Sequence, residues 1–261
     1  MKKGICIGCL PRDASLAEKL RLAKRAGYDG VEINTLASAA EREEYAALAR
    51  EIGIELPSVM ASGHWQYPLS SDNEETRQAG LANIRASVDT AAAVGAATVL
   101  VVPGVVNDTQ PYASAYEIAL RSVRELAPYA AARRIRLGVE NVWNRFLLSS
   151  REMGQFLAEV NSPAVGLYFD CGNIMAYGYP QLWLRELRQW LLKVHVKDFD
   201  TNTRQFRHLL QGNVPWKEVH AALVEADYHD YLTVELPPYP AYGDQMVFDS
   251  ARQLDRIIAG E

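Results

Sequence analysis

The sequence predicts a single (β/α)8 TIM barrel that spans residues 1–261, and three observations support this fold. Short apolar runs alternate with longer amphipathic runs along the whole chain. The chain has the length of about 250 residues that eight strand-plus-helix units need. No Pro- or Ser-rich linker and no run of charges divides it. A doubly wound open sheet is the rival fold, but it would need a Gly-rich phosphate-binding turn after the first strand, where "GCLPRDAS" stands instead.

The elements follow from the period of the apolar residues. Eight short apolar runs are predicted to be strands, at 4–9, 30–34, 55–60, 97–102, 136–141, 165–170, 192–197 and 231–236. Six amphipathic runs are predicted to be helices, at 15–27, 72–95, 114–134, 150–161, 216–228 and 249–260. Ser15 is a candidate N-terminal cap, and Gly27 and Gly95 are expected to end their helices.

Charge and cysteine usage narrow the functional classes. The formal net charge is −5, whereas proteins that bind the nucleic-acid backbone are usually basic. We find no signal-peptide core and no membrane span, so we expect a cytoplasmic protein that binds a small molecule. Cys6 and Cys9 have C-x-x-C spacing, but with Cys171 they form no disulfide framework and no second cysteine pair exists. We therefore expect packed, reduced cysteines.

Four consecutive predicted strands end on metal-ligating residue types: Glu140, Asp170, His195 and Glu235. In a barrel the carboxyl ends of the strands form one rim, where function collects. Taken singly, each residue is better explained as a salt-bridge, capping or core residue. Together, three carboxylates would repel one another without a cation, so a shared divalent metal is favoured. Oxygen ligands with one nitrogen suit Mn²⁺, Mg²⁺ or Co²⁺, and Zn²⁺ is compatible.

Further polar and aromatic residues at this rim are candidates for substrate binding. His64 and Trp65 follow the third strand, and Trp143 and Asn144 follow Glu140. Aromatic faces with imidazole and amide donors are suited to a sugar. Two charged residues have open roles: Glu32 is a substrate contact or a salt-bridge partner, and Lys197 binds a substrate oxygen or phosphate or pairs with a carboxylate such as Glu32.

These residues resemble the xylose-isomerase-like TIM barrels, in particular the sugar phosphate isomerases and epimerases, over essentially the whole chain. The most specific segments are "GVEIN", "LGVENVW", "GLYFDCGNIMAYG" and "LLKVHVKDFD". They look most like the branch of L-xylulose 5-phosphate (hexulose-phosphate) 3-epimerases. The resemblance implies a divalent metal, commonly Mn²⁺, held by Glu140, Asp170, His195 and Glu235. It also implies that Glu140 and Glu235 exchange the proton at C3 through a metal-stabilised enediolate.

The chain departs from this pattern at two places. Many relatives have a substrate-gripping His where this chain has Asn173, which we expect to bind substrate in its place, and Gln211 replaces an acidic residue of a turn. Arg204 and Arg207 are candidates for binding a phosphate, so a free or a phosphorylated sugar remains open. The alternatives are an aldose–ketose isomerase, an endonuclease IV-like abasic-site repair enzyme, a polyol dehydratase and a non-catalytic barrel. A homo-oligomer is left open.

Overall fold

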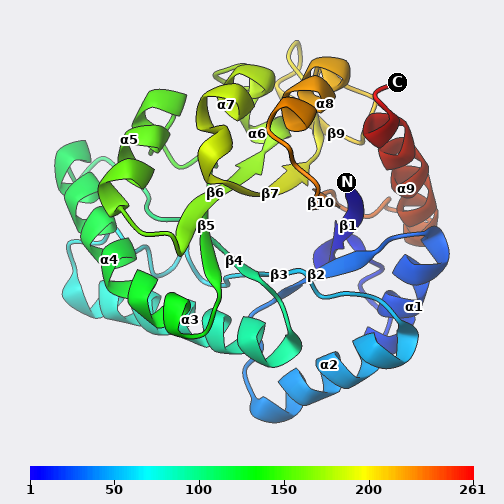
Figure 1. The fold of residues 1–261 in the computed structure, drawn as a ribbon, viewed down its shortest axis with the longest axis horizontal. Coiled ribbons are helices and arrows are strands. Elements are labelled where there is room, and N and C mark those ends of the chain that lie inside the picture. Colours follow the sequence, from blue (N-terminus) through cyan, green and yellow to red (C-terminus); the bar gives the residue numbers. More distant parts are fainter.

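Eight parallel strands close into a barrel in the computed structural model, which describes all residues from 1 to 261. Figure 1 shows the strands at the centre with the helices around them. The barrel order is β1-β10-β7-β6-β5-β4-β3-β2, and this closure confirms the predicted fold. The strands are β1 (Lys2–Cys6), β2 (Gly30–Asn34), β3 (Ser58–Met60), β4 (Thr98–Val101), β5 (Arg136–Glu140), β6 (Val165–Asp170), β7 (Leu191–Val196) and β10 (Tyr231–Val234).

The helices form the outer layer of the barrel. They are α1 (Leu16–Ala26), α2 (Ala39–Ile52), α3 (Glu74–Val94), α4 (Tyr112–Ala132), α5 (Ser150–Val160), α6 (Cys171–Ile174), α7 (Pro180–Leu187), α8 (Trp216–Glu225) and α9 (Gly243–Ala259). Two short 3-10 helices, η1 (Ile7–Cys9) and η2 (Arg188–Trp190), and an antiparallel hairpin, β8 (Asp198–Asp200) with β9 (Gln205–Arg207), complete the fold. None of the helices combines the length and the hydropathy that a membrane-spanning helix requires.

The ends of the helices agree with the predicted caps. The Ser15 side chain accepts a hydrogen bond from the backbone of Glu18, whose side chain accepts one from the Ser15 backbone in return. Gly27 and Gly95 end their helices in the left-handed conformation, with φ of 91° and 82°. Helix α2 was not predicted. The period of its apolar residues is weak, because only Ala46 and Ala49 are buried in it.

Two predicted strands extend three residues beyond one end of the strands that form. The strand predicted at 4–9 ends at Cys6, because the chain turns into η1 and Leu10 N–H bonds back to Ile7 O at 3.2 Å. The strand predicted at 55–60 is reduced to its last three residues, with one isolated bridge from Glu55 to Gly30. Pro57 has no N–H to donate, which limits pairing before Ser58.

The register between β6 and β7 shifts by one residue. Leu167 pairs with Leu191, but Tyr168 pairs with Lys193, so Leu192 is an extra residue on β7. This β-bulge at Leu192 packs closely against Gly166. A side chain at Gly166 would collide with the backbone oxygen of Trp190 and lie 2.7 Å from the Leu192 side chain.

Candidate metal and active site

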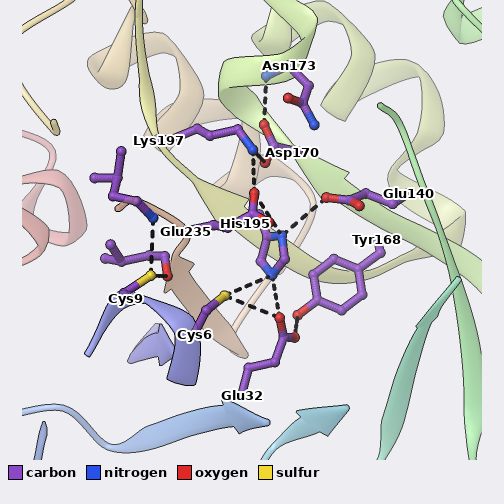
Figure 2. A network of polar contacts seen from close by, with 12 residues as sticks. Cys6, Cys9, Glu32, Glu140, Tyr168, Asp170, Asn173, His195, Lys197 and Glu235 are labelled. Atoms are coloured by element: carbon purple, nitrogen blue, oxygen red, sulfur yellow. Dashed lines mark hydrogen bonds and ion pairs between the residues drawn. The ribbon is translucent and has the colours of Figure 1, made fainter. Parts of the chain in front are cut away.

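The four predicted metal-ligating residues meet at one end of the barrel. One ligand atom from each of Glu140, Asp170, His195 and Glu235 lies within 4.8 Å of the others. Strand pairing explains this meeting, because Asp170 and His195 are register partners and Glu235 N–H bonds to Val196 O at 3.2 Å beyond the end of β10. Figure 2 shows the side chains converging.

The imidazole of His195 lies at the centre of the carboxylates. Its Nδ1 atom is 3.2 Å from Glu140 Oε1 and 3.8 Å from Glu235 Oε2, while its Nε2 atom faces Glu32. His195 is fully buried. The Lys197 ammonium lies 2.9 Å from Asp170 Oδ2 and also contacts Glu235 Oε2. Four carboxylates thus face at most two cationic groups, and the site carries excess negative charge.

The pKa values reflect this excess charge. Burial, together with the nearby carboxylates of Glu235 and Asp170, raises the pKa of Glu140 to about 7, although its contact with His195 opposes the shift. Burial alone would lower the pKa of Lys197, but the carboxylates of Asp170 and Glu235 raise it well above its usual value. The cluster therefore favours bound protons or a bound cation.

The donor set fits a divalent metal ion. Asp170 Oδ1 accepts the backbone N–H of Asn173 at 2.6 Å, whereas its buried Oδ2 accepts no hydrogen bond and has only the ion pair with Lys197. The Lys197 ammonium balances charge at this oxygen, and the Oδ2 lone pairs that no hydrogen bond uses are able to bind a metal ion. Three carboxylates and one imidazole are ligands that Mn²⁺, Mg²⁺, Co²⁺ and Zn²⁺ accept.

Glu32 lies beneath this cluster and is 1% exposed. It accepts hydrogen bonds from Ser58 Oγ at 2.6 Å and from the Tyr168 hydroxyl, and its Oε1 atom is 2.8 Å from His195 Nε2. Lys197 pairs with Asp170 and Glu235 rather than with Glu32. The sequence left two roles open for Glu32, a substrate contact and a salt-bridge partner. These contacts support the role of salt-bridge partner.

An open cavity of about 390 Å³ leads to the cluster. Its lining includes several residues that the sequence analysis did not single out as site residues: Cys6, Arg12, Asn34, Met60, Phe206 and Pro237. The thiol of Cys6 lies 3.3 Å from Glu32 Oε1 and 3.6 Å from His195 Nε2. Cys6 is thus reduced and packed as expected, but it is packed against the site.

Two aromatic rings form one wall at the rim. Trp143 stacks on Phe206 of the β8–β9 hairpin, with ring centroids 4.7 Å apart at 27°, and Trp143 Nε1 donates to Asn173 O at 2.9 Å. Trp143 is 45% exposed and Phe206 38%. The Lys197 ammonium lies 4.9 Å from the Phe206 ring centroid. The wall thus joins an apolar face to the charged cluster.

The other candidate substrate contacts differ in whether their polar groups are already hydrogen-bonded within the protein. Asn144 is 4% exposed. Its side-chain amide donates a hydrogen bond to Gly104 O at 2.7 Å and accepts one from the N–H of Phe146 at 3.1 Å. Asn173 donates to Asn141 O at 2.9 Å. His64 uses Nδ1 against Ala61 O at 2.9 Å, which leaves Nε2 available.

Two further predicted residues lie near the surface. Trp65 is 57% exposed and packs edge-on against the His64 ring, with centroids 5.0 Å apart. Arg207, a candidate for binding phosphate, pairs with Asp200 at 3.3 Å.

The chain matches the family model of the xylose isomerase-like TIM barrel over residues 20–256, and it belongs to this family. It is similar to the L-ribulose-5-phosphate 3-epimerase UlaE of Salmonella paratyphi C (strain RKS4594), with 26% identity over 247 residues that cover 89% of this chain and 86% of the relative.

Solved structures share the fold. A D-psicose 3-epimerase crystallised with D-fructose has a TM-score of 0.83 at 20% identity and covers 100% of both chains. The 3-keto-D-glucoside 4-epimerase YcjR of E. coli has a TM-score of 0.84 at 19% identity and covers 98% of this chain and 99% of its own. An L-ribulose 3-epimerase has a TM-score of 0.85 at 15% identity, with coverage of 99% and 94%.

Proposed function

We propose that this protein is a divalent-metal-dependent ketose 3-epimerase that acts on a sugar or sugar phosphate. The observation that carries the proposal is the pair of glutamates, Glu140 and Glu235, which approach His195 Nδ1 from the ends of two different strands of the barrel. The UlaE relative is an L-ribulose-5-phosphate 3-epimerase, which supports the reaction class.

Inversion of a carbon centre needs a base on one face of the substrate and an acid on the other. In the metal-free protein the surroundings of the two glutamates differ. Burial raises the pKa of Glu140 to about 7. Burial would also raise the pKa of Glu235, but the ammonium of Lys197 and then the charge of His195 lower it below its usual value. In one direction Glu235 removes the C3 proton and Glu140 returns one to the opposite face, and their roles reverse in the other direction.

Glu140, Asp170, His195 and Glu235 would hold the metal. When bound, a divalent ion acts as a Lewis acid that stabilises the negative charge developing on the substrate oxygens of the enediolate. We propose Mn²⁺ as this ion, with Mg²⁺, Co²⁺ and Zn²⁺ as the alternatives to be compared.

Of the substrate contacts that we propose, Phe206 and Lys197 line the cavity. The Trp143–Phe206 wall is proposed to present an aromatic face to the C–H side of the sugar, and His64 and Lys197 to supply polar groups for its oxygens. Asn173 and Trp65 are proposed as outer contacts. The occupied side chains of Glu32 and Asn144 support a role in positioning other groups instead.

The test is a turnover screen of five- and six-carbon ketoses, free and phosphorylated, with Mn²⁺ added. NMR in deuterated water reads the position of solvent exchange. Exchange at C3 with interconversion of C3 epimers is expected, and Glu140→Gln and Glu235→Gln should each lose turnover. Exchange confined to C1 and C2 would assign an aldose–ketose isomerase instead, and nicking of an abasic duplex would assign the DNA-repair alternative.

We also propose that the protein works in the cytoplasm on a small molecule and binds neither nucleic acid nor membrane. The single domain over 1–261 remains a prediction. Sedimentation velocity at micromolar concentration distinguishes a monomer from a homo-oligomer, both of which the sequence left open.

A further inference from the structure

We propose that Glu32 is a positioning residue whose carboxylate holds the Nε2 side of His195, so that the Nδ1 lone pair points to the proposed metal. This inference rests on the metal site proposed above. It assigns to Glu32 the control of metal affinity rather than contact with the substrate.

The first step is the geometry of the imidazole. Both ring nitrogens of His195 face carboxylates, with Nε2 2.8 Å from Glu32 Oε1 and Nδ1 3.2 Å from Glu140 Oε1. Neither the His195 nor the Glu32 side chain has any exposed area. A neutral imidazole carries one N–H, and the nitrogen with the closer carboxylate acceptor is the one that keeps it. This arrangement selects Nε2–H, which leaves Nδ1 free to bind a metal.

The second step is that Glu32 is itself fixed in place. Ser58 Oγ donates to its Oε2 atom at 2.6 Å, the Tyr168 hydroxyl donates to the same atom, and the Cys6 thiol donates to Oε1 at 3.3 Å. Figure 2 shows Cys6 and Tyr168 on either side of the Glu32–His195 contact. Because these donors come from β1, β3 and β6, the carboxylate cannot rotate away without breaking contacts to three strands.

The third step concerns the ring plane. The Tyr168 ring packs on the imidazole, with centroids 4.6 Å apart at 60°, while its hydroxyl binds Glu32. One residue therefore restrains both the plane of the ligand and the acceptor behind it. A carboxylate behind a metal-binding histidine fixes its orientation and raises its basicity, and removing such a partner typically costs about 10- to 100-fold in metal affinity.

The alternative is that Glu32 and His195 form a buried ion pair that only stabilises the barrel. Lys193 and Asp230 form a partly buried pair of this kind, with Nζ 2.7 Å from Oδ1, the lysine side chain 2% exposed and the aspartate side chain 35% exposed. This pair makes no contact with the metal cluster, so Asp230→Asn is the control for loss of a carboxylate charge away from the site. A structural role for Glu32 predicts that Glu32→Gln, like Asp230→Asn, leaves metal affinity unchanged.

The experiment is a direct Mn²⁺ titration of metal-stripped protein by EPR, with folding checked by circular dichroism. Glu32→Gln keeps the shape of the side chain and removes its charge, and we expect its Kd for Mn²⁺ to rise about 10- to 100-fold. Asp230→Asn should match the wild type. Tyr168→Phe, which keeps the carboxylate but removes one of its donors, should weaken binding by a smaller factor. It also serves as the test variant if Glu32→Gln does not fold.

A second readout is the hydrogen bond from His195 Nε2–H to Glu32. In ¹⁵N-labelled protein loaded with diamagnetic Mg²⁺, the Nε2–H proton should be shifted downfield by the Glu32 carboxylate in the wild type, and this shift should be smaller in Glu32→Gln. A folded variant that binds Mn²⁺ like the wild type would overturn the inference, as would a wild type that binds no Mn²⁺. A wild type that binds Mn²⁺ but epimerises no ketose would overturn only the proposed function.

Discussion

Metal binding should release protons in a pH-dependent way, and Glu140 is the group that sets the dependence. The perturbation is the addition of Mn²⁺ to metal-stripped protein at pH 6 and at pH 8. Burial and the nearby carboxylates raise the pKa of Glu140 to about 7. A carboxyl with that pKa is about 0.9 protonated at pH 6 and about 0.1 protonated at pH 8. Since a metal ligand must be ionised, proton release should fall by about 0.8 per site between these two pH values.

Calorimetry in two buffers of different ionisation enthalpy measures the number of protons released. His195 also loses its Nδ1 proton on metal binding. Glu140→Gln cannot titrate at position 140, so its proton release should change less between pH 6 and pH 8 than that of the wild type. Equal release at both pH values in the wild type would refute the reasoning, and so would an undiminished difference in Glu140→Gln.

Four further outcomes are expected. Without metal, the free energy of unfolding should fall by up to about 3 kcal/mol as pH rises from about 4.5 to about 7. The reason is that the raised pKa of Glu140 makes the folded state bind more protons than the unfolded state over that window. Urea titrations across pH would show this fall, and Mn²⁺ should reduce it. Asp198→Ala should lower stability by about 2–4 kcal/mol in chemical denaturation, since the buried carboxylate accepts the N–H groups of Val214 at 3.0 Å and of the Trp216 indole at 3.0 Å. Phe206→Ala should raise KM about tenfold with an unchanged Kd for Mn²⁺, and equal KM values would exclude the aromatic wall from binding. Gly166→Ala should cost about 1–3 kcal/mol by crowding the Trp190 backbone, which a lowered Tm would reveal.

The barrel and the meeting of the four ligand residues could be anticipated because both depend on strand ends. An apolar strand that closes on Glu140 or Asp170 places that carboxylate at the rim of any parallel barrel. The same reasoning cannot say which partner a residue finds across the barrel. Glu32 and Lys197 both point inward, yet Glu32 bonds to His195 and Lys197 to Asp170, and only the closed structure fixes those distances.

The sequence indicated only one of the two residues that form the aromatic wall. Trp143 follows directly after a strand end and was recognised, whereas its stacking partner Phe206 lies on the β8–β9 hairpin. That hairpin has three residues in each strand, too few for an apolar period to stand out. Arg12 was missed for a similar reason, because its place at the cavity depends on how the loop after η1 folds.

The extra residue Leu192 has a consequence for anyone who would move this site to another scaffold. Side chains alternate in direction along a strand, so a one-residue insertion decides whether two neighbouring strands present their inward residues at the same height. With Leu192 set aside, Tyr168 pairs with Lys193 and Asp170 with His195. An idealised barrel without this irregularity would pair Asp170 with an outward-facing residue. Gly166 and Leu192 are therefore as much a part of the transplantable unit as the ligands themselves, although neither carries any chemistry.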